Sequence, residues 1–316
     1  MKILKTIQKI PGGLMAIPLL TGAVINTVFP SAFQIGGFTT GLFTGTSALM
    51  GLFLVCSGAS IRFNQVGVPL YKGIILTAIK FALGVALGWG VQKICGPAGF
   101  WGLTPFVLIA ALTNSNGAIY STLAGQYGDA TDVGAISILS LNDGPFFTMI
   151  ALGATGLADI PLLSLVAAIV PIVVGFVLGN LDSDLRNLFE KSVPMVVLFC
   201  AFSLGATMNL GTIVQAGFSG ILLGLLTVLV TGLGGFFIYN ILLKKKGVIG
   251  AAIGTCAGNA IATPAAVVAA DPSLAQYEAA ATTQIAAAVI ITAILCPLLV
   301  AFLDRVRNKE NRTTQN

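Results

Sequence analysis

This chain has few charged residues, no histidine and no closely spaced pair of cysteines. Charged residues make up only 9% of the 316 residues, whereas soluble globular domains contain about a quarter. There is no histidine, which excludes an imidazole base, an imidazole metal ligand and a histidine pH switch. The five cysteines form no CxxC pair, so metal or redox chemistry is not expected. A soluble enzyme, a nucleic-acid binder and a secreted disulfide scaffold are excluded, and no cofactor is expected.

Apolar residues dominate instead. Hydrophobic residues reach 56%, the mean hydropathy is +0.96, and 38 glycines and 13 prolines stand within apolar runs, as is typical of transmembrane helices. Ten apolar segments, each about as long as a membrane-spanning helix, lie at 13–29, 44–61, 71–92, 99–118, 133–155, 161–180, 193–209, 216–243, 248–268 and 279–303. The fold class predicted is an all-α membrane protein with ten transmembrane helices.

The basic residues indicate an orientation. If the N-terminus is inside, 14 of the 16 lysines and arginines fall on the inner side, Lys72 among them. Outer loops then hold only Lys93, and Lys80 is left within a span. This bias fits the positive-inside rule. We expect a multi-pass protein of the cytoplasmic membrane with both termini in the cytoplasm.

Two stretches recur at nearly one offset. Gly58-Ala59-Ser60 matches Gly205-Ala206-Thr207, 147 residues later, and Asn116 matches Asn259, 143 residues later. The matched pieces fall in corresponding spans of two five-span halves, residues 1–157 and 158–316. An odd number of spans inverts the second half, and inverted repeats are typical of secondary transporters.

Polar and helix-breaking residues interrupt two apolar segments. The fourth contains Thr113-Asn114-Ser115-Asn116-Gly117, and the ninth contains the stretch 258–264, GNAIATP. Exposed backbone groups at membrane depth require a protein or water-filled environment, and broken helices direct positive dipole ends toward anions. One alternative is a packing kink. Because the breaks occupy corresponding repeat positions, we favour a binding centre.

Asp143 lies midway along the fifth segment. A carboxylate at that depth is a candidate functional group, and burial would make it a proton carrier near neutral pH; a structural hydrogen bond is the alternative. Its neighbour Asn142 would serve the substrate or the backbone. Gln284, in the tenth segment, would bond a substrate hydroxyl or a neighbouring helix.

Lys80 stands roughly 13 Å into the bilayer, counted at the helical rise from Lys72. It would either snorkel to the interface, act as counter-ion to Asp143, or stand where a sodium ion would otherwise sit.

Several stretches resemble the 2-keto-3-deoxygluconate permeases, and the resemblance covers almost the whole chain. They are IQKIPGGLMAIPLLTGAVINT at 7–27, CSGASI at 56–61, ALTNSNGAIYSTLAGQYG at 111–128, LNDGPFFTMIALGATGLA at 141–158 and VVGFVLGNLDSDLRNLF at 173–189. This family is similar to the bile-acid–sodium symporters and auxin carriers. That resemblance implies ten spans in two inverted repeats, unwound crossing helices 4 and 9, and a core of helices 3–5 and 8–10. The core would move against a panel of helices 1, 2, 6 and 7.

The resemblance also implies proton-coupled uptake of 2-keto-3-deoxygluconate, a six-carbon sugar acid, and it alone supplies this substrate. By position, the substrate would be lined by Asn114, Ser115, Asn116, Asn259 and Thr263. Asp143 and Lys80 would couple protons. The ninth-segment break holds no carboxylate, unlike many sodium-coupled relatives, which argues for protons.

Rival functions remain open. A sodium-coupled symporter of another organic anion would use Asn116, Asp143 and backbone carbonyls as ligands. A membrane enzyme is disfavoured because metal-ligand clusters and paired intramembrane carboxylates are lacking, and a channel because charged rings and a filter repeat are lacking. The partners expected are the sugar acid, protons and the lipid bilayer, with a homo-oligomer as an option and no nucleic acid.

Overall fold

Helices make up most of the part that the computed structural model describes, namely residues 3–8, 13–62, 67–139, 142, 144–206, 210–243 and 248–313. Within these ranges the only extended pairing is an isolated bridge between Phe100 and Leu103. The all-α prediction is therefore confirmed for the described residues.

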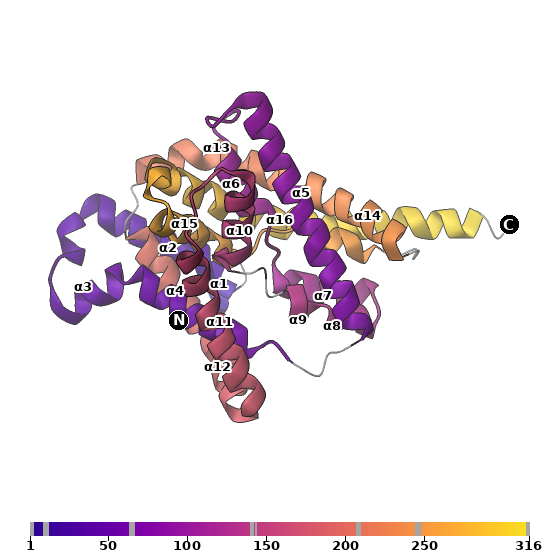
Figure 1. Cartoon of the computed structure of the whole chain (residues 1–316), viewed down its shortest axis with the longest axis horizontal. Coiled ribbons are helices and arrows are strands. Elements are labelled where there is room, and N and C mark those ends of the chain that lie inside the picture. The colour runs from indigo at the N-terminus through magenta and orange to yellow at the C-terminus, as the bar shows by residue number, and fades with distance from the viewer. Residues whose placement is uncertain are drawn as a thin grey trace.

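In the described residues, sixteen α-helices and several tighter or wider turns follow one another along the chain (Figure 1). The first half holds α1 (Ile3–Gln8), α2 (Gly13–Val28), η1 (Pro30–Phe33), α3 (Gly37–Thr44), α4 (Thr46–Ala59), α5 (Val68–Cys95), α6 (Pro105–Leu112), α7 (Gly117–Tyr127), α8 (Ala130–Gly134), α9 (Ile136–Leu139) and α10 (Pro145–Thr155). The second half holds α11 (Leu162–Leu181), α12 (Ser183–Gly205), α13 (Leu210–Thr227), η3 (Val228–Leu233), α14 (Gly234–Leu243), η4 (Ile249–Ile253), η5 (Gly258–Ala262), α15 (Thr263–Ala270), η6 (Pro272–Leu274) and α16 (Ala275–Thr313).

Membrane spans can be recognised among these helices by length and composition. Six described helical stretches are long and apolar enough to cross a bilayer, and there are seven if α3 and α4, bent by 61°, form one span. Each of the ten apolar segments of the sequence contains at least one described helical element. Several of these, such as α6 and α10, are too short to span alone because a break interrupts the segment. The protein is thus a multi-pass membrane protein, and the number of ten spans stays a prediction.

Glycines bring the helices of one group into backbone contact. In this group, which comprises α2, α4, α11 and α12, α4 packs on α11 and α2 packs on α12. A Cβ on Gly58 would lie 2.1 Å from the Ile172 carbonyl oxygen, and one on Gly205 would lie 2.0 Å from that of Leu19. Small residues at such contacts are typical of membrane helix pairs.

The remaining long helices form a second group around the two predicted breaks. Here α5 packs against α6 and α14, while α13 packs along α16. In Figure 1, α3 and α4 lie at one end of the molecule, and the C-terminal end of α16 extends past α14 at the other. Between α13 and α14 the helix widens into a π-turn, η3, a feature that often marks functional sites.

Candidate functional site

The first predicted break is present as the non-helical stretch 113–116. The second was predicted at 258–264, but those residues form η5 and the start of α15, and the non-helical backbone lies just before them. The helix α6 ends at Leu112, and α7 begins at Gly117 after Asn116, whose side chain accepts the Ile119 N–H at 3.1 Å. The second break separates η4 from η5 at residues 254–257. Capping by Asn116 satisfies one of the backbone donors that a new helix N-terminus exposes.

Hydrogen bonds join the two breaks to each other. The Asn116 N–H donates to Thr255 Oγ1 at 2.9 Å, and the Ala257 N–H donates to Asn114 Oδ1 at 2.9 Å. The Asn114 amide also donates to the Ala110 carbonyl. Segments more than 130 residues apart in the chain therefore satisfy each other's backbone groups in the interior, as unwound backbone at membrane depth requires.

Lys80 reaches this junction from α5. Its side chain is fully buried, and its Nζ donates to Thr231 Oγ1 at 2.9 Å and to the carbonyls of Ile253 and Thr255 at 2.8 Å each. Three neutral oxygens thus match the three donors of an ammonium group. The snorkelling alternative is wrong for Lys80 in this structure, because the side chain turns inward to the ninth-segment break.

Two polar side chains beside the first break are buried without a partner among the described residues. Ser115 and Asn142 are each only 1% exposed, and no described group bonds Ser115 Oγ or either amide atom of Asn142. Buried polar groups are normally satisfied by protein, water or ligand. Asp143, the predicted proton carrier, lies outside the described residues.

The other predicted site residues are placed differently. Thr263 is buried at the start of α15, and Asn259 lies in η5. The Gln284 amide nitrogen donates to the Gly102 carbonyl at 2.8 Å and to Ser219 Oγ at 2.9 Å. Gln284 therefore ties α16 to α13 and to the loop before α6, and no described hydrogen bond links it to the breaks.

A buried charge network was not expected from the sequence. Lys72, counted above as an inner-side charge, is 1% exposed and pairs with Asp129 at 3.0 Å and with Asp132. Tyr239 donates to Asp132 Oδ1 at 3.0 Å. The hydrogen bonds from Thr131 and from Lys72 hold the pKa of the Asp129 carboxyl well below its usual range. This network fastens α5, α8 and α14 together.

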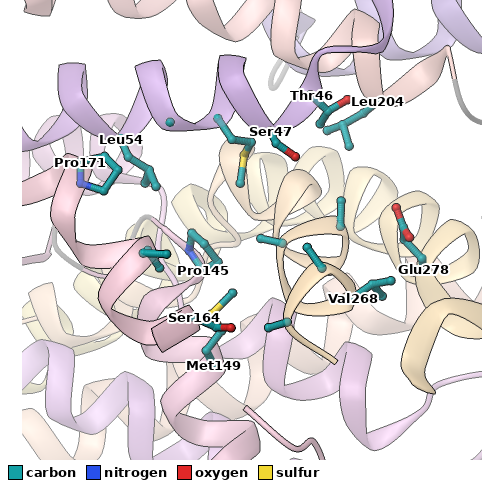
Figure 2. Close-up of a pocket in the computed structure, with 18 residues that line it drawn as sticks. Thr46, Ser47, Leu54, Pro145, Met149, Ser164, Pro171, Leu204, Val268 and Glu278 are labelled. Carbon is teal, nitrogen blue, oxygen red and sulfur yellow. The ribbon is translucent and has the colours of Figure 1, made fainter. Parts of the chain in front are cut away.

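A cavity of about 620 Å³ opens between the two helix groups (Figure 2). Helices α4, α11 and α12 line one side, and α10, α15 and α16 line the other. Gly144 lies directly before the lining residue Pro145, and a Cβ there would approach Leu54 of α4 to 2.9 Å. The two groups therefore touch beside the cavity, close to the first break and Asn142.

Sequence reasoning missed Thr231 and Thr255, which hold Lys80. Thr255 stands within a polar, glycine-rich run, which is a usable signal. Thr231 is one threonine in an apolar helix, and only the π-turn presents it to Lys80.

Comparison of the sequence with known proteins assigns the chain to a protein family. The family model described as 2-keto-3-deoxygluconate permease matches residues 4–309. A 2-keto-3-deoxygluconate permease 1 of Salmonella typhimurium is 49% identical, with both chains covered completely. Proteins named 2-keto-3-deoxygluconate permease from Bacillus subtilis and Pectobacterium carotovorum are 39% and 40% identical, over 99% and 95% of this chain and 97% and 96% of theirs. The family consists of transporters and not enzymes, and this chain, matched along almost its whole length, belongs to the 2-keto-3-deoxygluconate permease family.

Proposed function

We propose that this protein is a secondary active transporter that takes up 2-keto-3-deoxygluconate together with protons across the cytoplasmic membrane. The names of its relatives support the substrate. The observation that carries the site is the buried Lys80 ammonium at the junction of the two broken segments. A membrane protein tolerates such a charge at depth chiefly for function.

The substrate carboxylate suits this charge. Within the described part of the chain, no acidic side chain forms an ion pair with Lys80. Its three acceptors are neutral, so the positive charge is solvated but not cancelled. An anion approaching the junction would therefore be attracted, and the N-terminal ends of α7 and α15 would add to the attraction.

The polar residues around the breaks would bind the sugar hydroxyls. Ser115 and Asn142 have unused hydrogen-bonding atoms, and Asn114, Asn116, Asn259 and Thr263 surround the same segments. Gln284 would offer only its amide oxygen, since its nitrogen is engaged. In this proposal Asp143 exchanges the proton, and Lys80 tunes or neutralises its charge.

Alternating access would arise from two inverted halves, residues 1–157 and 158–316. The contacts of Gly58 and Gly205, which correspond in the sequence repeat, support this division because both glycines admit a helix from the other half. The group of α2, α4, α11 and α12 would act as the static panel, and the elements around the breaks would move against it. Both termini would face the cytoplasm.

Uptake into proteoliposomes tests the function. Labelled 2-keto-3-deoxygluconate is supplied under an inward proton gradient in sodium-free buffers, with a proton ionophore as control. Accumulation that the ionophore abolishes is the expected result. Accumulation that requires sodium would mean that sodium, and not the proton, is the coupling ion. No uptake under either gradient would mean that 2-keto-3-deoxygluconate is not the substrate.

A further inference from the structure

Among the residues that the structure describes, Glu278 is the only titratable side chain that lines the cavity between the two helix groups. The 18 lining residues otherwise present hydroxyls, thioethers, prolines and aliphatic groups, including Thr46 and Ser47 of α4 and Ser164 of α11. Figure 2 shows Glu278 at one end of the cavity, on the far side of α15 from Ser164 and Met149. The described lining of this largely apolar cavity therefore holds a single carboxylate.

This carboxylate has no cationic partner in the described part of the chain. The nearest titratable neighbours in sequence are engaged elsewhere: Tyr277 packs against the hydrophobic core, and Asp271 accepts the backbone N–H groups of Asp159 and Ser273. Glu278 is half-buried in the first turn of α16. The carboxylate thus lies at the positive end of the α16 helix dipole.

We propose that Glu278 is a proton-binding residue of the transport cycle, ionised in the empty cavity and protonated when an anionic sugar acid occupies it. This inference rests on the proposed function, because it requires an anionic substrate. It adds a second titratable group to Asp143, the proton carrier of the proposed function.

Like-charge repulsion provides the coupling. Two unit negative charges that share one cavity repel each other, so each weakens the binding of the other. The substrate is thus accepted together with a proton from the water of the cavity, which joins a carboxylate oxygen of Glu278. When the substrate leaves on the other side, the proton returns to water. By reciprocity, protonation strengthens substrate binding by the same factor.

Calorimetry on the purified full-length protein tests this proposal. Binding of 2-keto-3-deoxygluconate is measured between pH 5.5 and 8.5 in sodium-free solution, in buffers of different ionisation enthalpy that report proton uptake. For the natural protein we expect Kd to rise with pH and protons to be taken up on binding. For Glu278→Gln we expect a Kd at low pH as tight as that of the natural protein. The rise in Kd between pH 5.5 and 8.5 should be at least tenfold smaller, and fewer protons should be taken up on binding.

Two further variants separate this role from a structural one. Glu278→Asp should retain the pH dependence, and Glu190→Gln, on α12 and paired with Arg62 away from the cavity, should match the natural protein. Glu278→Gln with the natural pH profile and proton uptake would overturn the inference and leave the transporter proposal intact. A natural protein that binds no substrate at any pH would overturn both.

Discussion

Lys80 places a positively charged side chain at the junction of the two broken segments. Replacing it by methionine keeps most of the volume but leaves Thr231 Oγ1 and the carbonyls of Ile253 and Thr255 without their donor. Each unsatisfied buried acceptor costs about 1–3 kcal/mol, and the attraction for a substrate anion is lost as well. We therefore expect Lys80→Met to lower uptake in proteoliposomes at least tenfold and to lower the melting temperature.

Lys93 provides the matched control for that substitution. It lies on the same helix, exposed, over the Trp89 ring, so Lys93→Met should change uptake and melting by little. If Lys80→Met protein transports at the natural rate, Lys80 is not part of the substrate site.

Lys72 and Asp132 form the second buried charge centre. Asp132→Asn removes one of the two carboxylates that compensate an almost completely buried ammonium. Breaking a buried pair costs about 3–5 kcal/mol, and the remaining Asp129 reduces this to about 1–3 kcal/mol here. The double variant Lys72→Met/Asp132→Asn should be less destabilised than the sum of the single variants. Additive losses in thermal melts would show that the pair is not coupled.

Asp129 makes the stability that this network contributes sensitive to acid. Its pKa is depressed by the Thr131 hydroxyl and by Lys72, so its contribution to stability is complete above the unfolded pKa of about 3.9. The contribution is lost as the pH falls through the lower folded pKa. Melting temperatures should therefore fall below about pH 4, and Asp129→Asn should melt lower at pH 7 with a shallower acid decline. Parallel profiles for the two proteins would argue against this role.

At the level of helices, the sequence predicted breaks more reliably than contacts. The first break was predicted at 113–117, where Asn116 caps α7, because such a residue acts on its own backbone. The starts of α6 at Pro105 and of α10 at Pro145, inside two predicted segments, were not predicted. The pairing of Lys80 with Thr231 depends on helix rotation and a π-turn. Burial of Lys72 likewise depends on α8 and α14, which are distant in the chain. The residues that neighbour Lys80 and Lys72 in the sequence give no signal of these contacts, because the contacts depend on how distant helices pack.

The glycine contacts between α2 and α12, and between α4 and α11, make a helix-scale prediction. A methyl at Gly58 or Gly205 would collide with backbone, so Gly58→Ala and Gly205→Ala should each destabilise by about 1–3 kcal/mol through overpacking. If these positions are repeat mates, the two losses should agree closely. In α5, Gly90 faces open space, and Gly90→Ala should be neutral or stabilising by up to about 1 kcal/mol. Thermal melts in detergent measure all three.

For the whole molecule, the order of apolar segments followed directly from hydropathy, because each span is a local property of about 20 residues. The family resemblance implied that the unwound fourth and ninth segments cross. Hydrogen bonds between Asn116 and Thr255 and between Ala257 and Asn114 join these segments, and the inverted repeat stays a prediction. The cavity was not expected, since its lining comes from six helices spread over more than 230 residues. Small alanines and hydroxyls carry no signal of a cavity until those helices are assembled.

The cavity predicts one-sided access to Ser164, which lines it near the start of α11. Among the five cysteines only Cys95 is exposed, so Cys95→Ser should give a background that membrane-impermeant thiol reagents do not label. Ser164→Cys in that background should be labelled in right-side-out vesicles, severalfold more slowly when 2-keto-3-deoxygluconate is present. Ser183, exposed at the start of α12, lies in a loop predicted to be cytoplasmic, and Ser183→Cys should be labelled only in inverted vesicles. In the proposed transport cycle the substrate passes between the two helix groups, so equal labelling of Ser164→Cys with and without substrate would mean that the cavity is not the route.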